Sequence, residues 1–184
     1  MSAKGGERAF IVGLRTQSRI IPFSLLEEPM KRITATFSVT DAQDSVAPVA
    51  PHEAYLTVAV GLMRGANVLA AAPLSESAMA LALLSGQILE CSLKAFLSKA
   101  GRTERELRRK DVRHNLLELW ALAVREGLCI TATPPQWAET LNRLHDYPYH
   151  LRYPMGLHGL VLPNPQQTTS ELEHLIDTVR QKNR

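Results

Sequence analysis

The chain has little that would support a secreted scaffold or a membrane anchor. It contains only two cysteines, Cys91 and Cys129, in 184 residues, which excludes a disulfide framework and a cysteine-rich zinc site. Its first residues, MSAKGGERAF, lack the apolar stretch of a secretory signal, and no uninterrupted apolar run has the length of a membrane span. We therefore expect a cytoplasmic protein that does not enter a membrane.

The motifs of several enzyme classes are also missing from the sequence. There is no Gly-rich loop ending in Gly-Lys-Ser/Thr, no Gly-x-Gly-x-x-Gly, no Gly-x-Ser-x-Gly and no His-Glu-x-x-His. Both cysteines lie in apolar stretches, which favours unreactive thiols over a catalytic nucleophile. The formal net charge of +3 permits an anionic partner but does not require one.

The chain changes character near residue 50. Before it, the runs RAFIVGLR, RIIPFSLL and RITATFSVT carry β-branched residues and are broken by glycine and proline, which favours strands or irregular structure. Residues 41–51 hold two prolines, two aspartates and a serine, a composition typical of a linker. We therefore predict an N-terminal extension and linker at 1–50, followed by a separate domain at 51–184.

After residue 51 the sequence pattern is helical. Apolar residues recur at helical spacing, and prolines and glycines mark the ends of the segments. Thr168 with Glu171, or Ser170 with Glu173, has the spacing of a capping box at the start of the last segment. We predict an all-α bundle of about five helices with short connections. The predicted helices cover residues 51–72, 75–101, 114–128, 133–147 and 168–184.

Residues 102–113 form a highly charged segment. They hold six Arg or Lys residues against three Asp or Glu residues, a net charge of +3 that equals the formal net charge of the whole chain. One interpretation is a patch that faces phosphate groups, with Arg108 and Arg109 as candidate contacts. The other is a solvated helix whose charges pair with one another, and we favour this second interpretation.

Aromatic and basic residues gather at 145–158. Three of the four tyrosines of the chain lie within seven residues here, among arginine and histidine. Side chains such as Tyr149, Tyr153 and Arg152 can stack on bases and hold phosphates, and imidazoles can transfer protons near neutral pH. Alternatively, the tyrosines fill the core of the bundle while their hydroxyl groups reach solvent.

Three stretches of the chain resemble the HEPN family of helical bundles: ILECSLKAFL (88–97), HNLLELW (114–120) and LHDYPYHLRYP (144–154). In that family a Glu-x-x-Leu-Lys-like stretch lies on a core helix, and a His-Asp/Asn-Leu-x-x-Leu stretch opens the next helix. A Tyr-x-x-Arg-Tyr-Pro-like stretch near the last core helix is a feature of one subgroup. The resemblance covers about residues 51–180 and leaves 1–50 unexplained. The matching residues are Glu90, Leu93, Lys94, His114, Asn115, Leu116, Leu119, Tyr149, Arg152, Tyr153 and Pro154.

The resemblance implies an activity and a catalytic pair. Many HEPN proteins are metal-independent endoribonucleases of toxin–antitoxin and phage-defence systems, and they carry an Arg followed, after four to six residues, by a His. Two such pairs meet across a homodimer cleft. The sequence holds four pairs with this spacing: Arg108–His114, Arg109–His114, Arg143–His150 and Arg152–His158. The order of the elements selects the last pair, in which His158 would transfer protons and Arg152 would stabilise charge at phosphorus, without a metal or other cofactor.

The resemblance also implies a binding surface and partners. The candidate binding residues are Tyr149, Tyr153, His114, Glu90, Lys94, Arg108 and Arg109. Glu90 and Lys94 are spaced for an ion pair on one helix, or they face the cleft. The implied partners are RNA or a nucleotide, a second copy of the chain, and an antitoxin or other protein. Two alternatives stay open: a non-catalytic module that binds a nucleotide, RNA or protein, and a scaffold whose residues 1–50 add strands to a partner.

Overall fold

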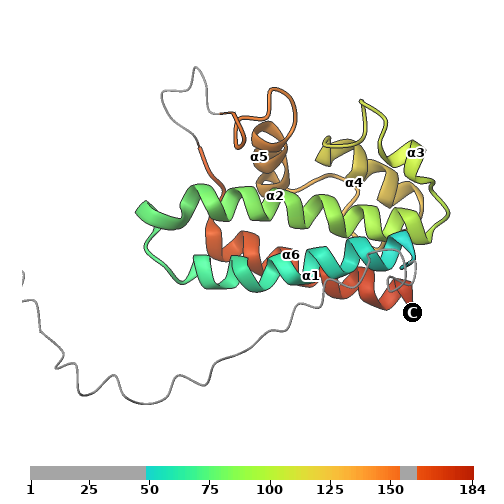
Figure 1. Ribbon diagram of the computed structural model, residues 1–184, viewed down its shortest axis with the longest axis horizontal. Coiled ribbons are helices and arrows are strands. Elements are labelled where there is room, and N and C mark those ends of the chain that lie inside the picture. The colour runs from blue at the N-terminus through green and yellow to red at the C-terminus, as the bar shows by residue number, and fades with distance from the viewer. Residues whose placement is uncertain (1–48, 154–160) are drawn as a thin grey trace, which may run out of the picture. The chain divides into compact units, whose positions relative to one another are not determined.

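The computed structural model describes residues 49–153 and 161–184, which all belong to one compact unit, Val46–Arg184. The described residues form six helices and no strand, so the prediction of an all-α bundle is confirmed (Figure 1). The predicted strands or irregular structure before residue 49 lie outside the described residues. The helices are α1 (Pro51–Ala70), α2 (Leu74–Lys99), α3 (Glu104–Leu107), α4 (Leu116–Arg125), α5 (Gln136–His145) and α6 (Pro165–Asn183).

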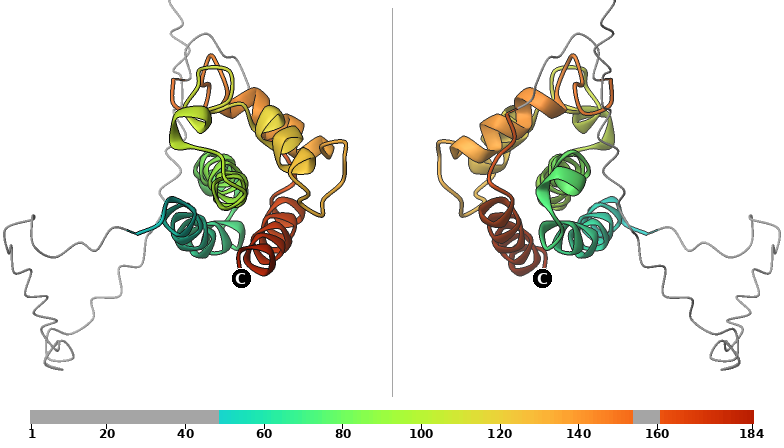
Figure 2. Two further views of the ribbon diagram at one scale, coloured as in Figure 1. Left: turned by 90° about the vertical axis from the view of Figure 1, so that its right-hand side faces the viewer. Right: turned by 90° about the vertical axis from the view of Figure 1, so that its left-hand side faces the viewer.

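The longest helix, α2, lies at the centre of the bundle. It contacts α1, α4, α5 and α6, and the end-on views in Figure 2 show these helices arranged around it. Its second half is buried on every side from Ile88 to Leu97, which explains why apolar residues there do not follow a single stripe. Because every neighbour packs on α2, a polar side chain in this stretch must find its partners inside the protein.

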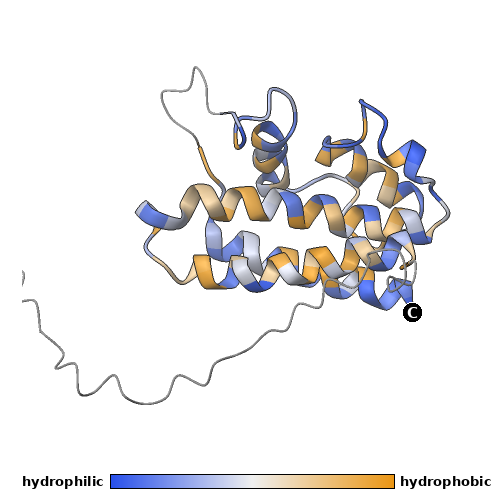
Figure 3. Cartoon of the chain, viewed as in Figure 1, coloured by the Kyte–Doolittle hydropathy of each residue, from blue (hydrophilic) through white to orange (hydrophobic). Residues whose placement is uncertain are grey.

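The apolar character of α2 has a second consequence. Among the described residues it is the one helix that is long and apolar enough to cross a membrane by length and composition, with a mean hydropathy of 1.4 over 18 residues. This level is reached without an uninterrupted apolar run, because serine, glutamate and glutamine residues are interspersed along α2. Within the bundle, 78% of that window is buried against the other helices, and Figure 3 shows hydrophobic residues along α1 and α2 where the two helices pair. The core position accounts for the hydropathy.

Local signals set several helix ends. α1 begins at Pro51, as the sequence predicts, because proline is preorganised for the first turn of a helix. α2 ends before Gly101, whose φ of 100° is a left-handed conformation that glycine adopts without strain. Thr103 and Glu106 then form a reciprocal capping box that starts α3.

The start of the last helix differs from the prediction. α6 begins at Pro165, and the side chain of Asn164 accepts a hydrogen bond from the backbone N–H of Gln167. Thr168 is therefore already inside the helix and is buried, so the predicted capping boxes at 168–173 were wrong. Asparagine followed by proline is a sufficient start by itself, because it supplies both the cap and the fixed φ of the first turn.

Candidate functional site

A buried ion pair stands in the middle of the core helix. Glu90 and Lys94 are each only 4% exposed, and their Oε1 and Nζ atoms are 2.7 Å apart. The predicted ion pair therefore exists, but it is enclosed by the bundle. Lys94 also donates a hydrogen bond of 2.7 Å to the backbone carbonyl of Arg113, and its Nζ lies 5.9 Å from the ring centre of Tyr55 on α1. These contacts tie α2 to the turn before α4.

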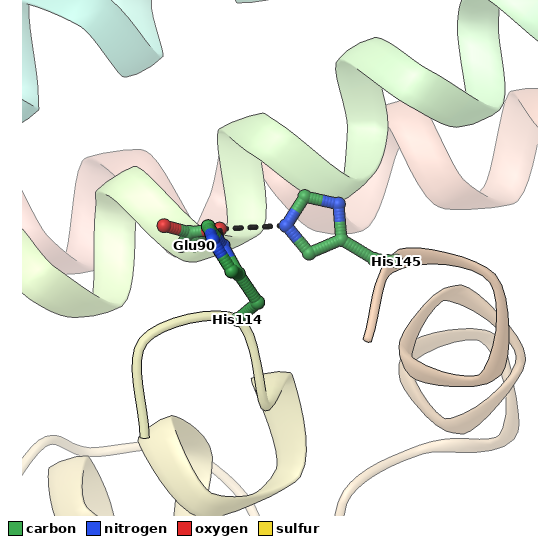
Figure 4. A group of neighbouring side chains, drawn as sticks. All are labelled: Glu90, His114 and His145. Atoms are coloured by element: carbon green, nitrogen blue, oxygen red, sulfur yellow. Dashed lines mark hydrogen bonds and ion pairs between the residues drawn. The ribbon is translucent and has the colours of Figure 1, made fainter. Parts of the chain in front are cut away.

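Two histidines share the other oxygen of the same carboxylate (Figure 4). Nδ1 of His114 is 3.1 Å from Oε2 of Glu90, and Nε2 of His145 is 2.6 Å from it. His114 comes from the turn before α4 and His145 from the last turn of α5, so three segments distant in sequence meet here. We call Glu90, Lys94, His114 and His145 the Glu90 cluster.

The carboxylate of Glu90 is ionised. Burial alone raises the pKa of a carboxyl group, but here the hydrogen bond from His145, the charge and hydrogen bond of Lys94 and the hydrogen bond from His114 outweigh it. Together they lower the pKa of Glu90 to about 2. Because an ionised carboxylate only accepts hydrogen bonds, a proton must sit on Nδ1 of His114 and on Nε2 of His145.

The remaining nitrogens of the two rings differ in environment. Nδ1 of His145 is fully buried, and no described residue forms a hydrogen bond with it. The side chain of His114 is 22% exposed, and its Nε2 has no hydrogen-bond partner among the described residues. His114 is thus the member of the cluster that combines a fixed ring with access to solvent.

A glycine on α2 makes room for His145. A Cβ atom placed on Gly86 would lie 2.7 Å from Nδ1 and 3.1 Å from Cγ of the imidazole. Real side chains do not approach that closely, so the ring packs directly against the bare backbone of α2, one turn before Glu90. His145 belongs to the stretch 145–158 in which aromatic and basic residues gather, but no motif in the sequence predicts its part in this site.

A strained tyrosine borders the cluster. Tyr149 has a φ of 62°, a left-handed conformation that is unfavourable for a residue with a large side chain. Its ring meets that of His114 edge to face at 5.6 Å, and its hydroxyl accepts a hydrogen bond of 3.4 Å from Arg113. Backbone strain of this kind is concentrated at functional sites.

The other tyrosines of this segment do not fill the core. Tyr147 is 81% exposed and Tyr153 is 64% exposed, and the ring of Tyr147 meets that of Tyr149 at 5.9 Å. The interpretation of these two side chains as core plugs was therefore wrong. Arg152 is also exposed, and its backbone N–H bonds to the carbonyl of Tyr149.

Several predicted site residues remain untested. Pro154 and His158 lie outside the described residues, so the structure says nothing about the Arg152–His158 pair. Four of the predicted binding residues, Glu90, Lys94, His114 and Tyr149, lie close together, but Glu90 and Lys94 are buried.

In the basic segment 102–113, half of the six basic side chains form ion pairs with described residues: Arg102, Arg108 and Arg109. Only Glu104–Leu107 is helical, and the rest consists of turns and irregular structure. The exposed Arg108 pairs with the partly buried Glu104 at 3.3 Å, and Arg109 pairs with Asp111 at 2.6 Å with both side chains exposed. No hydrogen bond or ion pair between described residues links either arginine to the Glu90 cluster. The favoured interpretation, a solvated segment with internal pairs, agrees with this arrangement except that most of it is not helical.

The described residues also contain one group with the donor atoms of a metal site, formed by Glu90, His114 and His145. Their ligand atoms lie within 4.8 Å of one another. The cysteines do not contribute to it: burial raises the pKa of the Cys91 thiol, and Cys129 lies exposed in a turn. The apolar sequence context that the two cysteines share therefore corresponds to burial for Cys91 but not for Cys129.

Comparison with known proteins returns nothing that identifies the chain. No family model, no curated protein and no solved structure matches it. The function must therefore be argued from the geometry of the Glu90 cluster and its surroundings.

Proposed function

We propose that this protein is a HEPN-like RNA-binding protein that cleaves RNA without a metal ion, with His114 as the group that transfers protons. The observation that carries the proposal is the fixed, partly exposed imidazole of His114. It donates to the buried, ionised Glu90 and stands beside Arg113 and Tyr149.

The geometry suits acid–base catalysis. Because Nδ1 of His114 donates to Glu90, the lone pair of the neutral ring is on Nε2, and a carboxylate partner stabilises the imidazolium that forms when Nε2 takes up a proton. In the cleavage step, Nε2 accepts the proton of the RNA 2′-OH while the 2′-oxygen forms a bond to phosphorus. The bond from phosphorus to the 5′-oxygen breaks, and the proton passes on to that oxygen. The products are a 2′,3′-cyclic phosphate and a free 5′-hydroxyl group.

The surrounding residues suit the substrate. The guanidinium groups of Arg113 and Arg152 are exposed and provide charge for the phosphate oxygens. The exposed rings of Tyr147 and Tyr153 offer flat surfaces on which unpaired bases stack. These features favour RNA over a small anion, which would not need several aromatic surfaces.

A second candidate function is binding of RNA or a nucleotide without cleavage. The exposure of Tyr147 and Tyr153 supports it, since these rings serve binding equally well with or without a chemical step. Under either function, the resemblance to HEPN proteins leads us to propose a homodimer and a role with an antitoxin or in phage defence.

The test is an RNA cleavage assay in EDTA with matched variants. His114→Asn retains an amide donor near the position of Nδ1 and so keeps the bond to Glu90, but it lacks Nε2. We expect it to lower the cleavage rate by about 10²-fold or more. His174→Asn, at an exposed position on α6, serves as the control and keeps full activity.

Two further variants separate the alternatives. Arg152→Ala and His158→Ala test the pair selected by the resemblance. If cleavage is lost in His158→Ala and kept in His114→Asn, the reaction uses that pair and our assignment to His114 is wrong. If wild-type protein binds RNA but yields no cyclic phosphate on several RNAs, the protein is a binding module.

A further inference from the structure

We infer that Glu90, His114 and His145 form a binding site for a divalent transition-metal ion with the preferences of Zn²⁺, and that this ion inhibits the protein. The inhibition rests on the function proposed above, whereas the site itself does not. The inference starts from the geometry of the three side chains in Figure 4.

The donor set is that of zinc. Two imidazole nitrogens and one carboxylate oxygen form a common protein site for Zn²⁺, with a fourth position left for water or another ligand. Mg²⁺ and Ca²⁺ prefer oxygen ligands and fit this set poorly. Lys94 donates to Oε1 of Glu90, which leaves Oε2 for the metal and orients the carboxylate from the second side.

The distances are close to what a metal requires. Bonds of about 2.0–2.1 Å in a tetrahedron place neighbouring ligand atoms about 3.3 Å apart. The corresponding separations from Oε2 of Glu90 are 3.1 Å to Nδ1 of His114 and 2.6 Å to Nε2 of His145. A rotation of the carboxylate and a shift of the rings therefore replace the two hydrogen bonds by three metal bonds, one from each side chain.

The charge balance predicts the fourth ligand. The opposite charges of Glu90 and Lys94 cancel, and both histidines bind a metal as neutral rings. The bound ion therefore adds two positive charges to a buried cluster, which favours an anion such as hydroxide or chloride in the fourth position. Access is through His114, the most exposed of the three ligands.

Metal binding also removes the proposed catalytic group. When Nδ1 of His114 binds the ion, the proton of the neutral ring moves to Nε2. That nitrogen then has no lone pair with which to accept the proton of a 2′-OH. Zn²⁺ is thus expected to suppress the cleavage that proceeds in EDTA.

The experiment measures binding first, without RNA. The full chain, with any affinity tag removed, is titrated with Co²⁺ as a spectroscopic substitute and with Zn²⁺ in a thermal-shift assay. Residues 1–48 contain neither histidine nor cysteine, so they supply no competing imidazole or thiolate ligand. We expect one ion per chain, the visible absorption of tetrahedral Co²⁺, and a higher Tm with Zn²⁺ but not with Mg²⁺.

Matched variants keep the result interpretable. His114→Asn and His145→Gln place amide nitrogens where each ring donates to Glu90, so they retain the hydrogen bonds but lose the metal ligands. We expect each to weaken binding at least tenfold, whereas His174→Asn binds as the wild type does. Circular dichroism confirms that each variant is folded. Absence of a one-to-one complex, or unchanged affinity in folded His145→Gln, overturns the site.

The two proposals can fail separately. If the metal binds as expected and the wild type never cleaves RNA, the nuclease proposal fails and the metal site stands. If cleavage in EDTA depends on His114 but added Zn²⁺ at saturation leaves its rate unchanged, the inhibition is wrong.

Discussion

Replacing Gly86 by alanine tests whether the Glu90 cluster is packed as described. Glycine in a helix is less favourable than alanine by about 0.5–1 kcal/mol, so this change would ordinarily stabilise α2. Here the new Cβ would lie 2.7 Å from Nδ1 of His145, a fully buried ring that must move away. Its displacement stretches or breaks the 2.6 Å hydrogen bond to Glu90.

The magnitude follows from the two effects of that displacement. Overpacking a well-packed core costs about 1–3 kcal/mol. Loss of a hydrogen bond to a charged group costs about 1.5–3 kcal/mol. After the gain in helix propensity is subtracted, we expect Gly86→Ala to lower the free energy of unfolding by about 2–5 kcal/mol.

Gly61 provides the matched control. It lies inside α1, and a Cβ placed on it would meet no atom within 4 Å. Gly61→Ala should therefore raise the free energy of unfolding by about 0.5–1 kcal/mol. The same chemical change is thus expected to have opposite signs at the two positions, which urea denaturation followed by circular dichroism measures directly.

A double-mutant cycle locates the cause. Once His145→Ala has removed the ring, Gly86→Ala no longer meets an obstacle and should stabilise the protein as Gly61→Ala does. The reasoning is refuted if Gly86→Ala alone is as stable as the wild type. It is also refuted if the penalty persists in the His145→Ala background.

Three further outcomes follow from the structure. Because the pKa of Glu90 is lowered from 4.5 to about 2, its ionisation stabilises the fold by roughly 3 kcal/mol above pH 4.5. This contribution is lost as the pH falls from 4.5 towards 2. Acid titration of the wild type measures the loss, and Glu90→Gln should lack this pH dependence. Thiol reagents should modify the exposed Cys129 in the native protein and the buried Cys91 only after denaturation, a difference that mass spectrometry detects. If Arg152 contacts a phosphate, Arg152→Ala should reduce the slope of RNA affinity against salt concentration by about 1.

The helical bundle could be predicted because its signals are local. Pro51 and Gly101 act on their own turns, and the apolar periodicity between them reflects a helix that needs no information from distant residues. We predicted the start of α6 too late because Asn164 and Pro165 follow a proline-rich stretch whose composition is typical of a loop. A capping residue has no effect on the apolar pattern, and the pattern led us to place the helix later.

The site could be predicted only in part, for a related reason. Glu90 and Lys94 share one helix, so their pairing depends only on a spacing of four residues. The participation of His145 depends on the contact between the end of α5 and Gly86 on α2, which are about sixty residues apart in the chain. No local pattern encodes that approach, and an isolated histidine in an amphipathic helix gives no sign of its partner.

The composition of the cluster argues that it serves more than stability. A buried ion pair recovers little free energy beyond the cost of desolvating both charges, and apolar side chains of similar volume would stabilise the core equally well or better. Yet the most enclosed helix of the bundle carries Glu90 and Lys94 at its centre, where one carboxylate accepts hydrogen bonds from Lys94 and from two histidines. An ionised carboxylate held in this way fixes the ring and the tautomer of His114, which no apolar residue can do. We propose that this requirement, in addition to any contribution to stability, retains a charge in the core.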